Sequence, residues 1–84
     1  MTPGPHYQFS RHARNRMRRV RLTEAEVIAA LAKPDEVRPS YKDRQNAWKR
    51  RGGQWLRVTH VIEKATTVVV TVTLTPRGPE RRQG

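Results

Sequence analysis

The architecture of this protein is set by residues 45–74, which read QNAWKRRGGQWLRVTHVIEKATTVVVTVTL. Two runs, 45–51 and 54–63, flank a Gly-Gly pair at 52–53. Glycines can adopt the positive φ angles that a two-residue hairpin turn requires, so this pattern predicts a β-hairpin. The run over 67–74 is rich in valine and threonine, the β-branched residues that favour strands in the middle of a sheet.

The hairpin fixes which side chains share a face of the sheet. With the turn at the Gly-Gly pair, Trp48 lies opposite Arg57 and Arg50 lies opposite Trp55, and successive side chains alternate between the two faces. The face expected to form the core carries Leu56, Val58 and Ile62, and the other face carries Trp48, Arg50, Trp55, Arg57 and Thr59. An odd number of loop residues before the last strand would add Val68, Val70, Val72 and Leu74 to the core and would place Thr67, Thr71 and Thr73 beside the tryptophans. We favour this register because the even alternative buries Arg57 beside four apolar side chains.

Two helices are predicted upstream of the hairpin. The first spans 11–20, because Ser10 is a good N-cap and apolar residues recur at helical spacing after it. The second spans 24–33, where Thr23 and Glu26 form a capping box and Pro34 ends the helix.

The remaining segments complete the expected fold. Residues 1–9 are either a flexible N-terminus or a short edge strand over Tyr7 to Phe9, and residues 36–41 suit an edge strand because they contain Pro39. Residues 76–84 lack apolar side chains and are expected to form a disordered basic tail. We therefore expect one α+β domain over 10–75, with two N-terminal helices packed on one face of a three- to four-stranded antiparallel sheet.

The charge of the chain points to an acidic polymer as its partner. The 84 residues include 18 Lys plus Arg against 7 Asp plus Glu, a formal net charge of +11, and 14 of the 18 are arginines, which suit bidentate contacts to phosphate. Zero cysteines exclude disulfides and zinc ribbons, and the three histidines lack metal-ligand spacing, so no metal and no cofactor are expected. No apolar run is long enough to span a membrane, and no basic segment carries bulky apolar anchors, so a cytoplasmic location without membrane contact is expected.

Two groups of residues could act on a nucleic acid. In the first predicted helix, His12, Arg16 and Arg19 lie along one margin, where a histidine can transfer a proton and an arginine can neutralise a phosphorane during attack by the RNA 2′-hydroxyl. A packing role for His12 is the competing interpretation. On the sheet, the tryptophans and arginines could stack on unpaired bases and bind phosphates, or each tryptophan could form a local cation–π pair with a neighbouring arginine.

The chain also resembles a known family. The run FSRHARNRMRRVRLTEAEVIAAL, the hairpin strand WLRVTHVIE and the strand VVVTVTL are similar to the DUF4258 domains over about residues 8–75. Those domains resemble the RelE-like and barnase-type small α+β ribonucleases, many of them toxins of toxin–antitoxin pairs. The resemblance implies functional roles for His12, Arg16 and Thr71, and it makes Lys49 or Arg50 a phosphate contact.

The function expected from the sequence is RNA binding with metal-independent endoribonuclease activity of the toxin type, on single-stranded or ribosome-associated RNA. The expected catalytic residues are His12, Arg16 and Thr71, and the expected RNA-binding residues are Arg19, Trp48, Lys49, Arg50, Trp55, Arg57 and Thr73. The alternatives are a non-catalytic RNA- or ribosome-binding module and a basic protein that binds an acidic partner such as an antitoxin.

Overall fold

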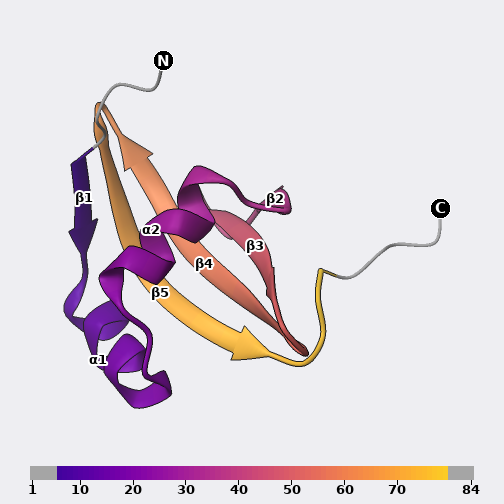
Figure 1. The fold of residues 1–84 in the computed structure, drawn as a ribbon. Helices are drawn as coiled ribbons and strands as arrows, with labels where there is room; N and C mark the ends of the chain where they lie inside the picture. Colours follow the sequence, from indigo (N-terminus) through magenta and orange to yellow (C-terminus); the bar gives the residue numbers. More distant parts are fainter. Residues whose placement is uncertain (1–5, 80–84) are drawn as a thin grey trace, which may run out of the picture.

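The computed structural model describes residues 6–79 as two helices and five strands (Figure 1). In chain order the elements are β1 (His6–Phe9), α1 (Arg11–Val20), α2 (Glu24–Ala32), β2 (Glu36–Pro39), β3 (Gln45–Arg51), β4 (Gln54–Glu63) and β5 (Thr66–Thr75). The helices at 11–20 and 24–33 and the strands of the Gly-Gly hairpin are thereby confirmed to within a residue. Residues 80–84 of the predicted tail and residues 1–5 lie outside the described residues.

The five strands form one mixed sheet in the order β1-β5-β4-β3-β2. The β2–β3, β3–β4 and β4–β5 pairs are antiparallel, whereas β1 runs parallel to β5, with His6 opposite Thr66 and Phe9 opposite Val69. The prediction of a three- to four-stranded antiparallel sheet was therefore wrong. Two short edge strands of four residues each enlarge the sheet, and the parallel one joins segments about 60 residues apart, which no local pattern in the sequence specifies.

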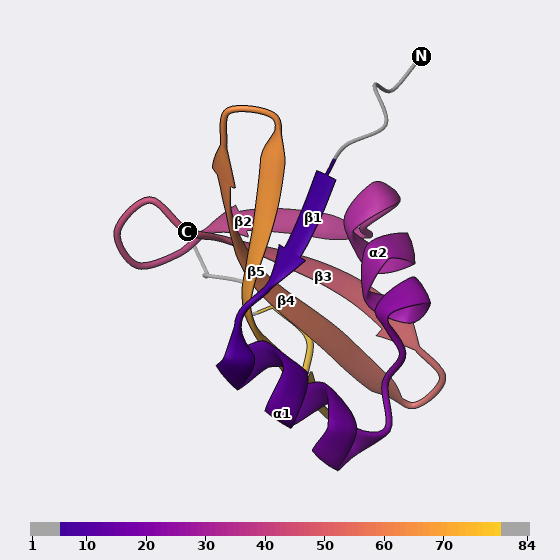
Figure 2. The same ribbon diagram turned by 90° about the vertical axis from the view of Figure 1, so that its left-hand side faces the viewer.

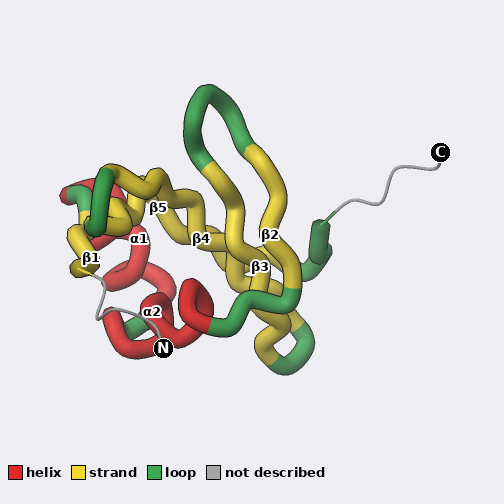
Figure 3. Tube along the Cα trace, turned by 90° about the horizontal axis from the view of Figure 1, so that it is seen from above, coloured by secondary structure: helices red, strands yellow, loops and turns green. Residues whose placement is uncertain are grey.

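Both helices lie on the same side of this sheet (Figures 2 and 3). Helix α1 packs along β5, while α2 packs across β3 and β4. The buried core between the two layers consists of Ala13, Met17, Leu22, Val27 and Ala30 from the helical layer and Ala47, Leu56, Val58, Val69 and Val72 from the sheet. No helix of residues 6–79 lies on the opposite side of the sheet (Figures 2 and 3), and we call that side the outer face.

Local capping interactions explain where the helices begin and end. The Ser10 hydroxyl accepts a hydrogen bond from the Ala13 N–H at 3.0 Å, and the C-cap residue Arg21, with a left-handed φ of 61°, stops α1 after Val20. At α2, the Thr23 hydroxyl accepts from the Glu26 N–H at 3.1 Å while the Glu26 carboxylate accepts from the Thr23 N–H at 2.9 Å. The capping box predicted from the sequence is therefore formed in full.

The hairpin register is confirmed, but the last strand departs from the expected alternation. Gly52 has a φ of 61°, and Trp48 pairs with Arg57 as the turn requires. The β4–β5 register shifts between Thr59 and His60, so that Thr59 pairs with Thr71 but His60 pairs with Val69. A bulge of this kind interrupts the alternation of a strand. The β5 side chains beyond it therefore lie on the opposite faces of the sheet from those that simple alternation predicts.

The bulge changes the predicted core. Val72 is buried as expected, but Val69 is fully buried in place of Val68 and Val70, which are only half-buried. Ile62, predicted to be core, is 60% exposed at the end of β4. Thr67 pairs with Ile62 and lies on the helix side by alternation from Val69, instead of beside the tryptophans.

The capping box predicts how stability depends on pH. The backbone hydrogen bond from Thr23, followed by the charge of Arg51, lowers the pKa of Glu26 below its ordinary value. A lowered carboxylate pKa stabilises the fold above the unfolded-state value of about 4.3, and the gain is lost as the pH falls through the folded-state pKa. The variant Glu26→Gln keeps a side-chain acceptor but lacks the charge, so its melting temperature should fall below that of the native protein at neutral pH and approach it in acid.

Thermal denaturation between about pH 2.5 and pH 7 measures this difference. Glu63→Gln is the control, because the Glu63 side chain is exposed and makes no ion pair among residues 6–79. A difference for Glu26→Gln that stays constant over the whole range would contradict the assignment.

Candidate nucleic-acid interface

The outer face presents its side chains in rows that run across the strands. Register places Trp48, Arg57 and Thr73 in one row. The flanking rows hold Arg50, Trp55 and Thr75 on one side and Asn46, Thr59 and Thr71 on the other. The structure therefore gathers most of the sheet residues predicted to bind RNA on one surface.

Trp48 lies under this surface and cannot act as an open stacking platform. Its side chain is only 8% exposed, and the Trp55 ring meets it edge to face with centroids 6.4 Å apart at 76°. The guanidinium of Arg57 lies 5.7 Å from the Trp48 ring centroid. The local cation–π pairing considered from the sequence is thus formed, and Trp48 supports Trp55 and Arg57 from below.

Arg57 carries an uncompensated charge at the centre of the outer face. Its Nη2 donates to the Thr73 hydroxyl at 3.3 Å, and no carboxylate within residues 6–79 forms an ion pair with it. The Arg57 Nε and the Trp48 Nε1 are both buried N–H donors without an acceptor in the described part of the chain. Buried donors that lack partners are costly, so the packing of Trp48 and Arg57 leaves two unsatisfied N–H groups below the outer face.

The two basic candidates of strand β3 face opposite ways. Arg50 is exposed on the outer face, with its guanidinium 5.8 Å from the Trp55 centroid and its backbone N–H donating to the Asp35 carboxylate at 2.7 Å. Lys49 points to the helix side, where its Nζ lies 3.9 Å from the same carboxylate. Of these two residues, the structure therefore brings only Arg50 together with the tryptophans.

Helix α1 lies along the part of the β5 edge that does not pair with β1. Parallel pairing with β1 stops at Val69, after which the Ser10 hydroxyl donates to the Val70 carbonyl at 2.8 Å. Further along the helix, the Arg16 Nε donates to the Val72 carbonyl at 3.4 Å. The backbone of β5 thus anchors the margin of α1 that sequence analysis singled out, next to Thr71 and Thr73.

Two other residues of that margin remain open to solvent. His12, one turn before Arg16, is exposed, and so is Arg19. The hydrogen bonds of this margin within residues 6–79 join Ser10 and Arg16 to β5, and none joins His12 to Arg16 or Thr71.

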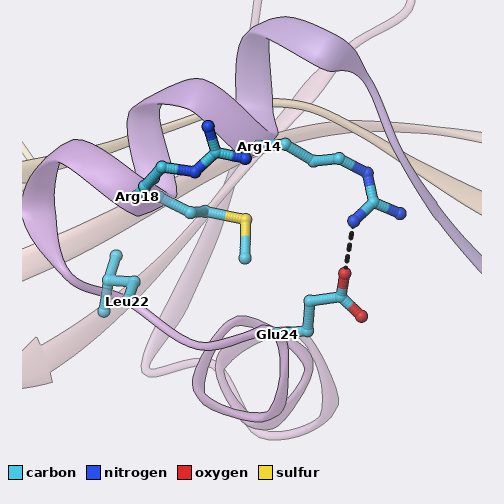
Figure 4. Close-up of a pocket in the computed structure, with 5 residues that line it drawn as sticks. Arg14, Arg18, Leu22 and Glu24 are labelled. Carbon is cyan, nitrogen blue, oxygen red and sulfur yellow. Dashed lines mark hydrogen bonds and ion pairs between the residues drawn. The ribbon is translucent and has the colours of Figure 1, made fainter.

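The opposite margin of α1 holds an open cavity of about 270 Å³ that the sequence did not indicate (Figure 4). Met17 and Leu22 supply its apolar lining, and Arg14, Arg18 and Glu24 surround it. Arg14 donates to the Glu24 carboxylate at 2.7 Å and lies 5.6 Å from the Phe9 ring. Helical spacing from i to i+4 places Arg14 and Arg18 side by side on α1. They line a cavity only because the start of α2 lies opposite them, and this packing of one helix against the other cannot be predicted from helical spacing.

Residues 6–79 contain neither a cluster suited to a metal ion nor a helix able to cross a membrane. No group of three or more His, Cys, Asp or Glu in residues 6–79 is placed to hold a metal ion. In that same part of the chain, no helix is long and apolar enough to cross a membrane. The third histidine of the chain, His60, is buried beside the core, with its Nδ1 3.1 Å from the Val58 carbonyl oxygen.

The chain matches a known protein family over most of its length. A family model described as "Domain of unknown function (DUF4258)" matches residues 9–73, which confirms the family resemblance carried by the first helix and the late strands. No curated protein and no solved structure matches the chain.

Proposed function

We propose, for a chain that belongs to the DUF4258 family, that it binds single-stranded RNA through the exposed margin of α1 and the outer face of the sheet. The observation that carries this proposal is the absence of counter-charges. Within residues 6–79, α1 and its C-cap hold six arginines, and only Arg14 forms an ion pair with a carboxylate. Arginines held together in this way favour a polyanion, which replaces their mobile counterions.

The composition of the outer face favours a single strand over a duplex. Trp55 is half-buried there and Arg50 lies over it, so the pair offers a ring and a charge at one place. Aromatic rings beside guanidinium groups bind unpaired bases and their phosphates, whereas the bases of a duplex are stacked on one another. The hydroxyls of Thr71 and Thr73 add hydrogen-bonding groups beside the α1 margin.

Salt titration tests the binding proposal. Each phosphate contact on a single strand contributes about 0.7 to the slope of log Kd against log salt. The double variant Arg19→Gln with Arg50→Gln should therefore bind labelled single-stranded RNA more weakly and lower that slope by about 1.4. Fluorescence anisotropy over a range of salt concentrations gives both quantities.

A matched double variant controls for net charge. Lys33→Gln with Lys64→Gln also removes two positive charges, at the C-cap of α2 and in the β4–β5 turn, away from the proposed surface. Its slope should stay at the native value. Equal slopes for the two double variants, or RNA affinity that does not respond to salt, would reject the proposed surface.

RNA cleavage is a second candidate function, and one observation favours it. His12 is exposed one helical turn before Arg16, whose guanidinium lies against the backbone of β5 at Val72. We propose that His12 takes the proton of the 2′-hydroxyl as that oxygen attacks the adjacent phosphorus, and that Arg16 stabilises the negative charge that develops on the phosphorane. The P–O5′ bond then breaks, which leaves a 2′,3′-cyclic phosphate, and the departing 5′-oxygen takes a proton from water. Thr71 would orient the phosphate between helix and strand.

A further inference from the structure

The chain beyond β5 returns to the outer face and covers Trp55. After Thr75 the chain bends away from the direction of β5 (Figure 1), and Gly78 lies directly against the Trp55 indole. A Cβ atom placed on Gly78 would lie 2.5 Å from Cε2 and 2.7 Å from Nε1 of that ring, closer than real Cβ atoms approach. Because glycine has no Cβ atom, the backbone at this position can lie directly against the ring.

Of the two partners in this contact, the segment after β5 is the more easily moved. Trp55 belongs to β4, which is paired with strands on both sides, and its ring also contacts Trp48 and Arg50. The segment 76–79, which we call the strap, makes one hydrogen bond within residues 6–79, from the Arg77 N–H to the Thr75 hydroxyl at 3.3 Å. That bond is local and does not attach the strap to the sheet.

We propose that the strap occupies a base-stacking site on Trp55 and that an unpaired RNA base displaces it. The inference rests on the proposed RNA-binding function and adds an intramolecular competitor to it. A protein whose site is open for only a fraction of the time binds its ligand with an apparent affinity reduced by that fraction. The strap therefore lowers the affinity for RNA in proportion to how firmly it rests on the ring.

Gly78→Ala separates the strap from the ring without touching the proposed RNA contacts. The probes are an oligouridylate of about ten nucleotides and a matched abasic ribose-phosphate oligomer, because stacking requires a base whereas phosphate contacts do not. Gly78→Ala should lower the Kd for the oligouridylate by about fivefold and leave the Kd for the abasic oligomer unchanged. Acrylamide should also quench the tryptophan fluorescence of this variant more strongly.

Two further variants complete the design. Gly53→Ala makes the same substitution in the hairpin turn, where nothing lies within 4 Å of the new Cβ, and should change neither Kd. Adding Trp55→Leu to Gly78→Ala should abolish the gain in affinity for the oligouridylate. Thermal denaturation should remain cooperative in all three variants, because the strap is not part of the core.

Distinct outcomes would overturn the two proposals. The strap is rejected if Gly78→Ala gives no gain, gains equally on both oligomers, keeps its gain in the Trp55→Leu background, or fails to unfold cooperatively. RNA binding itself is rejected if neither the native protein nor Gly78→Ala binds either oligomer. Binding of both oligomers with no effect at Gly78 leaves the phosphate surface standing and removes only the strap.

Discussion

Truncation of Leu56 to alanine is expected to lower the free energy of unfolding by about 2–5 kcal/mol. Leu56 is 2% exposed on β4, the central strand, where it pairs with Lys49 on one side and Leu74 on the other. This loss has two parts: the hydrophobic transfer free energy of the atoms that are removed, and the cost of the cavity that remains because the sheet is too rigid to close it. For a chain of 84 residues with a thin core, this is a large part of the total stability, which is about 5–15 kcal/mol in ordinary domains.

Ile62→Ala is the matched control for this prediction. Ile62 lies six residues further along the same strand, yet it is 60% exposed, so its truncation should cost about 0.5 kcal/mol or less. Urea denaturation with a shared m-value measures both changes. Equal losses for the two variants would mean that the end of β4 is buried in solution.

The second large effect concerns His12. If His12 transfers a proton during cleavage, His12→Ala should slow single-turnover cleavage of labelled single-stranded RNA by about 10²- to 10⁴-fold in the presence of EDTA. Fluorescence anisotropy should show a nearly unchanged affinity for RNA, because His12 is only one of many side chains that contact the RNA and the others remain. A fall in rate without a fall in binding distinguishes proton transfer from anchoring.

His6→Ala provides the comparison for His12→Ala. His6 is also an exposed histidine, and it lies on strand β1, outside the α1 margin. Its replacement should leave the cleavage rate unchanged. Absence of cleavage by the native protein, or equal rates for the native protein and His12→Ala, would remove the catalytic proposal and leave the binding proposal intact.

Local signals explain why much of the fold could be predicted from the sequence. Thr23 and Glu26 define the start of α2 through hydrogen bonds within four residues, and the Gly-Gly pair at 52–53 fixes the hairpin register through turn geometry alone. The faces of β3 and β4 follow from that register by simple alternation. Features decided within a few residues of the chain were therefore predicted correctly.

The errors arose where distant segments decide the outcome. Parallel pairing of β1 with β5 and the register shift at Thr59 depend on contacts between separate strands. Alternation placed Trp48 on the face opposite the core, but it could not show that Arg57 and Trp55 cover this ring. Gly78 gave no signal because a glycine among prolines and arginines resembles any linker.

The parallel pair at the edge of the sheet also has a consequence for biosynthesis. Within residues 6–79, β1 pairs with no strand other than β5, so a nascent chain keeps β1 unpaired until β5 has left the ribosome. The hydrogen bond from Ser10 to the Val70 carbonyl spans 60 residues, and closing so long a loop is slow relative to forming the β3–β4 hairpin. Protection of the β1 amides against hydrogen exchange should accordingly appear last during refolding, after that of the hairpin.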